Sequence, residues 1–239
     1  MAKHVDVALP SYEATTSLPS TVCCISINES DKIRLIGTPK DMRISFRDML
    51  KRSWSQGIQD DRDYYEQPEF KLFGRPWHGQ GDESVPSRVL LVEILRYMEQ
   101  QGWRYLAAAD ISKKHSDKDT LFFEYTGVVC SPVIFSISFN QSDRLRIICA
   151  PPEIQDAIRA VVRNCWRIQH ERRYNGSWEF KLLGDPWFAD GRETIRARVL
   201  LVNILAAIRA MGYKMYASIN ISGGDQGDLD SWFFRERSD

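Results

Sequence analysis

The sequence predicts an α+β protein built from two tandem pseudo-repeats of about 110 residues, and three observations predict this fold class. The segment EFKLFGRPW at 69–77 returns as EFKLLGDPW at 179–187. The segment RVLLV occurs at 88–92 and again at 198–202, and an Ile-Ser pair follows both at the same distance. An offset of this length exceeds the period of solenoid repeats and suits a small domain.

Each copy begins with a predicted β-hairpin. In the first copy the hairpin joins strands 22–27 and 32–36, and in the second it joins strands 134–139 and 144–148. Both turns begin with Asn and end with Asp, and these residues tolerate turn geometry because their side chains bond the local backbone.

Two helices are predicted in each copy from apolar residues at helical spacing. They cover 42–54 and 84–101 in the first copy, and 154–166 and 194–211 in the second. Between the two helices lies a polar stretch, at 59–68 and 169–178, which predicts a surface loop.

The remaining strands complete the unit. The strands at 69–73 and 179–183 end in Gly-x-Pro-Trp, where proline stops further ladder pairing. Alternating apolar residues predict two final strands, at 103–111 and 121–123 in the first copy and at 213–221 and 232–234 in the second. Each copy therefore reads β-β-α-β-α-β-β, with two helices on one face of a mainly antiparallel sheet.

The predicted domain organisation is an N-terminal arm at 1–19, a first repeat at 20–127 and a second repeat at 128–239. The junction at 125–132 has little linker composition, so we expect the repeats to pack closely, as a pair related by a pseudo-twofold axis. Separate domains and one continuous shared sheet remain alternatives, since strand order cannot be read from one sequence.

Composition bounds the function. The 239 residues are 43% hydrophobic and 27% charged, with 32 basic and 32 acidic side chains. This balance argues against a polycationic nucleic-acid binder. With no bilayer-length apolar run and no signal peptide, we expect a cytoplasmic or nucleocytoplasmic protein. The five cysteines and four histidines lack zinc-ligand spacing, so we expect free thiols and neither metal nor cofactor.

No catalytic motif is found in the sequence. Carboxylates do recur at matched positions: Glu69 and Glu179, Glu83 and Glu193, Asp117 and Asp228, Asp119 and Asp230. We interpret the glutamates before helices as dipole partners and the aspartates as turn residues. A hydrolase that uses two of these acids is a distant third hypothesis, because it needs two carboxylates that converge in a cleft.

The matched cations are the predicted binding residues, together with two matched tryptophans. They are Arg62 and Arg172, Lys71 and Lys181, Arg88 and Arg198, and Trp77 and Trp187. Six paired cations exceed what packing requires, so we expect some of them to meet a phosphate or a carboxylate of a partner. The competing interpretation is structural: Arg88 and Arg198 pair with the matched glutamates, the lysine stems cover apolar surface, and the tryptophans plug the core.

The arm carries a second candidate. Leu9-Pro10-Ser11-Tyr12 resembles the proline-tyrosine ligands of WW domains, with Leu9, Pro10 and Tyr12 as the recognised residues. A chance match of four residues is the alternative. From these observations we predict a non-enzymatic intracellular protein-interaction or adaptor module. The alternative function is a small-ligand or anionic-lipid binding protein with a pocket between the repeats.

Overall fold

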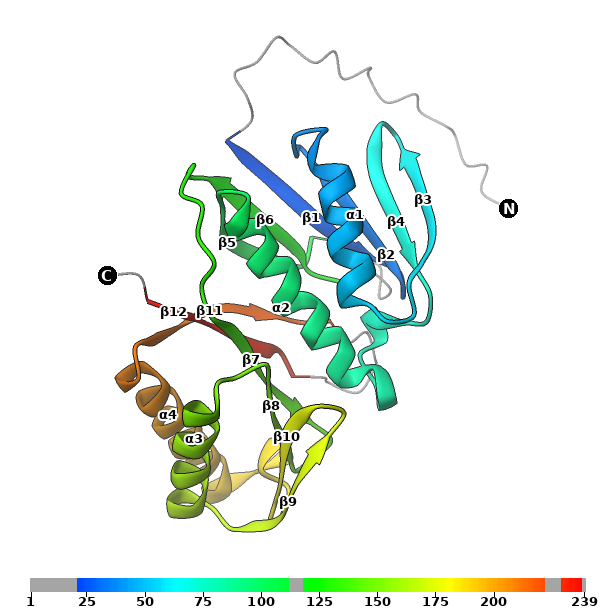
Figure 1. Ribbon diagram of the computed structural model, residues 1–239. Coiled ribbons are helices and arrows are strands. Elements are labelled where there is room, and N and C mark those ends of the chain that lie inside the picture. Colours follow the sequence, from blue (N-terminus) through cyan, green and yellow to red (C-terminus); the bar gives the residue numbers. More distant parts are fainter. Residues whose placement is uncertain (1–20, 112–117, 222–228, 238–239) are drawn as a thin grey trace.

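The computed structural model describes residues 21–111, 118–221 and 229–237 (Figure 1). The predicted arm, with Leu9, Pro10 and Tyr12, lies outside the described residues. The described chain forms two six-stranded antiparallel sheets, each with two helices on one face. This confirms the predicted class of a duplicated α+β unit.

The first repeat contains one sheet with the strand order β3-β4-β2-β1-β6-β5. Its strands are β1 (Val22–Asn28), β2 (Lys32–Ile36), β3 (Ile58–Tyr64), β4 (Gln67–Leu72), β5 (Trp103–Ala109) and β6 (Thr120–Tyr125). Its helices are α1 (Met42–Ser53) and α2 (Ser84–Gln100), with the short 3-10 segments η1 (Pro76–His78) and η2 (Gly81–Glu83) before α2.

The second repeat has the same strand order, β9-β10-β8-β7-β12-β11. Its strands are β7 (Ile134–Asn140), β8 (Arg144–Ile148), β9 (Ile168–Tyr174), β10 (Ser177–Leu182), β11 (Tyr213–Ile219) and β12 (Ser231–Glu236). Its helices are α3 (Pro152–Cys165) and α4 (Gly191–Ala210), with η3 (Pro186–Phe188) between β10 and α4.

The polar stretches predicted as surface loops are instead hairpins, and this adds a strand to each unit. The strands β3 and β9 lie at a sheet edge and carry charges on both sides, which protects an edge from pairing with another chain. They therefore lack the apolar alternation by which strands are predicted. A usable signal was the dipeptide Asn175-Gly176, whose φ angles of 46° and 83° form the turn between β9 and β10.

Matched tryptophans make the same hydrogen bonds in both repeats. The indole N–H of Trp77 donates to the carbonyl of Lys32 at 3.0 Å, and that of Trp187 donates to the carbonyl of Arg144 at 2.9 Å. Trp54 donates to Phe73 and Trp166 to Leu183 in the same way. The same tryptophan hydrogen bonds therefore fix the same strands and turns in both repeats.

The repeats are stacked rather than related by a twofold axis. Helix α2 covers its own sheet and also contacts β7 and β8, so it lies between the two sheets (Figure 1). Helix α4 packs on β11 and α3, and its opposite side is exposed. The expected pseudo-twofold relation is wrong, because a twofold axis would place α4 on β1 and β2 just as α2 lies on β7 and β8.

Candidate interaction surface

Two of the predicted binding cations hold buried carboxylates. The fully buried Glu69 accepts hydrogen bonds from Arg34 at 2.6 Å and from Arg62 at 2.7 Å. In the second repeat, Glu179 accepts from Arg146 and Arg172, both at 2.7 Å. Burial opposes ionisation of both glutamates, but the arginine hydrogen bonds outweigh it and lower the pKa of each carboxyl. Arg62 and Arg172 therefore have partners within the chain.

The predicted lysines also have matched partners. Lys71 Nζ lies 3.9 Å from a carboxylate oxygen of Asp31, and Lys181 Nζ lies 3.8 Å from Asp143. Both pairs are partly exposed, so they contribute little to stability. Their positions beside the hairpin turns match in the two repeats.

The last matched pair of cations separates into one buried and one exposed member. Arg88 is buried at the junction of the repeats, where it donates to the carbonyl of Gly79 at 2.6 Å and to the hydroxyl of Ser231 at 3.1 Å. Arg198 is exposed on α4. Trp77 is completely buried and Trp187 half-buried, so both tryptophans belong to the cores.

A buried polar network that the sequence did not indicate also joins the repeats. Glu99 at the end of α2 pairs with Arg235 of β12 at 2.9 Å and accepts from the Tyr216 hydroxyl at 2.5 Å and from the Cys130 thiol at 3.0 Å. Burial opposes the charge of Glu99, but these donors lower the pKa of its carboxyl. The network was missed because the equivalents of Glu99 and Arg235 are Arg209 and Glu124, which carry the opposite charges.

One family model matches the chain twice, over residues 21–124 and 133–235. The chain belongs to this family. Each match spans one six-stranded unit, so the family domain corresponds to one repeat of the fold. The match gives the domain and its bounds and assigns no activity. No curated protein and no solved structure matches the chain.

The two copies of the family domain differ most on one side of their long helices. On α2, Arg88 and Glu99 bond to Ser231 and Arg235 of the second sheet. The buried residues on the same side of this helix, about one turn apart, form what we call the α2 face: Val85, Arg88, Val92, Leu95 and Glu99. The equivalent stripe on α4 is the α4 face, which consists of Ile195, Arg198, Val202, Leu205 and Arg209.

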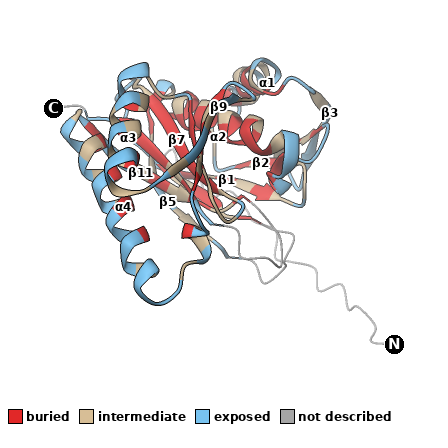
Figure 2. Ribbon diagram, turned by 90° about the horizontal axis from the view of Figure 1, so that it is seen from below, coloured by how far each residue is buried: buried red, intermediate tan, exposed pale blue. Residues whose placement is uncertain are grey.

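Burial of these two faces is opposite. Val85 and Val92 are 1% and 0% exposed, whereas Ile195 and Val202 are 67% and 63% exposed. Figure 2 shows α2 largely in the colour of buried residues and the outer side of α4 largely in that of exposed ones. Solvent-facing helix surfaces are normally polar, so an apolar stripe at this position is typical of an interaction surface.

The end of the α4 face borders a shallow pocket. The pocket has a volume of about 410 Å³ and is lined by Leu205, Ile208, Arg209, Tyr213, Lys214, Met215, Phe234 and Arg237. Its lining combines apolar side chains with three cations, so the α4 face continues into a surface that is both apolar and basic. Acidic and apolar groups of a partner would complement it.

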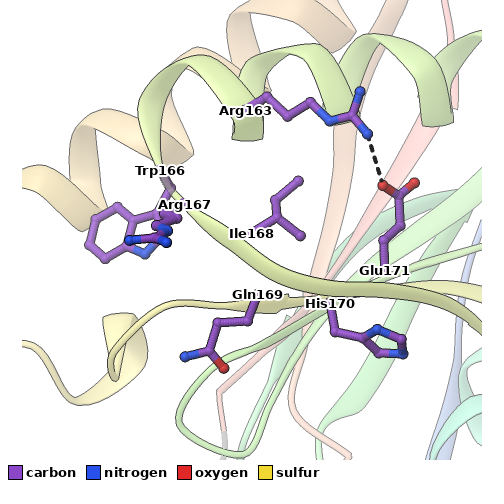
Figure 3. A pocket seen from close by; sticks show the side chains of 7 residues that line it. All are labelled: Arg163, Trp166, Arg167, Ile168, Gln169, His170 and Glu171. Atoms are coloured by element: carbon purple, nitrogen blue, oxygen red, sulfur yellow. Dashed lines mark hydrogen bonds and ion pairs between the residues drawn. The ribbon is translucent and has the colours of Figure 1, made fainter.

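A second pocket, of about 580 Å³, lies between the end of α3 and β9 (Figure 3). Its lining includes His170 and Glu171, a pair that could support acid–base chemistry. The carboxylate of Glu171 is already engaged, however, because Arg159, Arg163 and the Trp178 indole donate to it. These contacts identify Glu171 as a structural partner of α3.

One matched pair of aspartates, Asp119 and Asp230, meets at the junction, whereas Asp117 and Asp228 lie outside the described residues. Asp119 accepts a hydrogen bond from the backbone N–H of Asn220 at 2.8 Å. Its pKa is raised mainly by burial, and the nearby charges of Asp230 and Asp110 raise it further. Asp230 in turn accepts from the Ser218 hydroxyl at 2.8 Å. These contacts tie the residues just before β6 and β12 to β11 and to the residue that follows it, so the first of them joins the two repeats.

Proposed function

We propose that this chain is a non-enzymatic protein-interaction module that docks a partner protein through the α4 face. The observation that carries the proposal is the contrast between the two long helices. The α2 face is buried by a folded domain, while the equivalent α4 face keeps its apolar residues and has no cover within the described residues. Burying such a stripe is favourable by about 25 cal/mol for each Å² of apolar surface.

The charges of α4 indicate the chemistry of the partner. Four arginines and a single glutamate lie on this helix: Arg192, Arg196, Arg198, Arg209 and Glu193. We therefore expect a partner surface with an apolar centre and acidic groups around it. Complementary charge of this kind accelerates encounter and selects among partners.

Engagement of the carboxylates supports binding over catalysis. Glu69 and Glu171 are each held by two arginines and Glu179 by three, which leaves none of them placed as a general base. Within 21–111, 118–221 and 229–237, no group of three or more metal-ligating side chains is found. In the same ranges, no helix is long and apolar enough to cross a membrane. A cytoplasmic location and a WW-domain partner for the arm remain part of the proposal.

The junction of the repeats gives less support to the alternative function, a ligand pocket between them. Where the structure describes this junction, large side chains fill it, among them Arg88, Glu99 and Arg235. These side chains bond to groups of the opposite repeat, so a ligand there would have to displace them.

Affinity capture from cell extract with the immobilised full chain tests the proposal. We expect Val202→Asp to abolish capture of the bound proteins, because it places a charge in the centre of the α4 face. The matched control is Ile44→Asp, since Ile44 is 61% exposed on α1 and its equivalent in the second repeat is Asp156. Equal capture by wild type and Val202→Asp would refute the α4 face as the binding surface.

A further inference from the structure

We propose that the partner of the α4 face is a second copy of this chain, docked head to tail. The α4 face of one molecule would lie on the outer face of the first sheet of the next, in the way that α2 lies on the second sheet within the chain. This inference rests on the proposed function, because it names the partner of the same surface.

Both halves of the internal interface recur in uncovered form at opposite ends of the molecule. The α4 face repeats the α2 face. The outer face of the first sheet repeats the covered face of the second sheet: Val22 and Ile36 are 45% and 39% exposed, whereas their equivalents Ile134 and Ile148 are buried. A second copy would therefore bury apolar residues on both sides of the contact.

Charge complementarity is preserved, with the signs exchanged. Within the chain, Glu99 of the helix pairs with Arg235 of the sheet. The equivalent residues are Arg209 on α4 and Glu124 on β6, both exposed. Docking of a second copy in the same way would bring Arg209 of one molecule against Glu124 of the next. Opposite charges would meet in both interfaces, although neither residue type is retained.

The exchange of charge signs also determines which helix face can dock on which sheet. A helix with glutamate at this position would meet Glu124 with like charge if it docked on the first sheet, which is unfavourable. The α2 face therefore suits the second sheet, and the α4 face suits the first sheet. Such an arrangement favours one head-to-tail register over the reversed one.

Two polar contacts of the internal interface recur in residue type. Arg146 donates to the hydroxyl of Ser84 at 2.8 Å, and the equivalents are Arg34 and the hydroxyl residue Thr194. The Tyr174 hydroxyl reaches the carbonyl of Gly81 at 3.4 Å, and the equivalents are again a tyrosine, Tyr64, and a glycine, Gly191. A docked copy would find the same donors and acceptors.

The contact between the edge strands β5 and β11 also has an apolar equivalent on the uncovered surfaces. Within the chain, the rings of Tyr105 on β5 and Tyr216 on β11 lie 5.4 Å apart. Their equivalents, Met215 and Leu106, are 43% and 54% exposed. Several contacts do not transfer. Thr120, the equivalent of the Arg88 partner Ser231, is already buried within the chain. The donors Tyr216, Arg96 and Asn175, which bond to Glu99, to the carbonyl of Ile134 and to the carbonyl of Asp82, have Leu106, Ala206 and Tyr65 as their equivalents. The remaining contacts define one geometry for the second copy.

The geometry implies assembly into a ring or a filament rather than a symmetric dimer. The two surfaces are different and lie on opposite sides of the molecule, so the contact is heterologous. Heterologous contacts produce a closed ring when the rotation between copies closes, and a linear filament when it does not. Every molecule of a ring, and every molecule of a filament except the two at its ends, would use both surfaces.

Charge-reversal variants of the full chain, followed by sedimentation velocity over a concentration series, test this inference. We expect wild type to self-associate, and Arg209→Glu and Glu124→Arg each to weaken association about tenfold or more. The double variant, and a 1:1 mixture of the two single variants, should recover association because opposite charges meet again. Ile44→Asp should associate like wild type.

Two results would overturn the inference: a wild-type chain that stays monomeric at about 1 mM, or a double variant no better than the single ones. If wild type stays monomeric while capture from extract still depends on Val202, the proposed function holds and its partner is a different protein. If capture is also independent of Val202, both proposals fail.

Discussion

Helices α2 and α4 occupy the same place in the two repeats, yet α2 is buried on two sides and α4 on one. The residues on the second side are nevertheless similar, with valine or isoleucine at two matched positions and arginine at a third. The difference lies in the neighbour: α2 has the second sheet beyond it, and α4 has no such neighbour in the part of the chain that the structure describes. This apolar stripe, which has no neighbour among the described residues, is the basis of the proposed docking surface.

The largest expected difference in the free energy of unfolding is between variants of Glu99 and variants of its equivalent, Arg209. Glu99→Gln breaks a buried ion pair and leaves Arg235 uncompensated, so the free energy of unfolding should fall by about 3–5 kcal/mol. Arg209→Gln changes an exposed side chain and should alter it by less than about 0.5 kcal/mol. Urea unfolding at low protein concentration measures both values. Similar costs for the two variants would mean that the helices are not differently buried.

Truncation of matched leucines probes packing along the same faces. Leu95→Ala removes a completely buried side chain, and we expect a loss of about 2–5 kcal/mol in the free energy of unfolding. Leu205→Ala removes a half-buried side chain, so the loss should be about 1 kcal/mol. Thermal and urea denaturation report the difference. A larger loss of unfolding free energy in Leu205→Ala than in Leu95→Ala would mean that the α4 face is packed more tightly than the α2 face, which contradicts the account.

The sequence predicted the duplication because the core positions of both repeats have the same residue types. It did not reveal β3 and β9, since edge strands need no apolar face, nor did it reveal the pairing of Glu99 with Arg235. Those two residues have equivalents of opposite charge, and such a pair becomes informative only when the fold brings the helix and the sheet together. The exposed Arg198 was among the predicted cations, but the exposure of its apolar neighbours Ile195 and Val202 becomes apparent only in the fold.

Acid should destabilise the fold through the buried glutamates. The pKa values of Glu69, Glu179 and Glu99 are lowered by their arginine partners, so the folded state binds fewer protons than the unfolded state. The free energy of unfolding should be at its full value above the ordinary carboxyl pKa of 4.5 and should fall as the pH drops below it. Urea unfolding from pH 7 to pH 3 tests this. If the free energy of unfolding falls less steeply with pH in Glu99→Gln, the difference measures how much of the acid destabilisation comes from the junction of the repeats.

The smallest effect concerns the matched hairpin turns. The turn between β3 and β4 places Tyr65 and Glu66 at φ angles of 47° and 63°, where the second repeat has Asn175 and Gly176. Glu66→Gly should raise the free energy of unfolding by about 1 kcal/mol, because a side chain at positive φ is strained. Gly176→Glu should lower it by about as much. Thermal denaturation of both variants checks whether the two turns are equivalent.

Interchain disulfide formation tests the central claim most directly. One sample of the chain carries Met215→Cys and a second, of different mass, carries Leu106→Cys; the two are mixed and oxidised. The head-to-tail contact predicts a covalent heterodimer that contains both variants, since these positions repeat the internal contact of Tyr105 with Tyr216. A yield no higher than that of a mixture with Ile44→Cys would contradict the account.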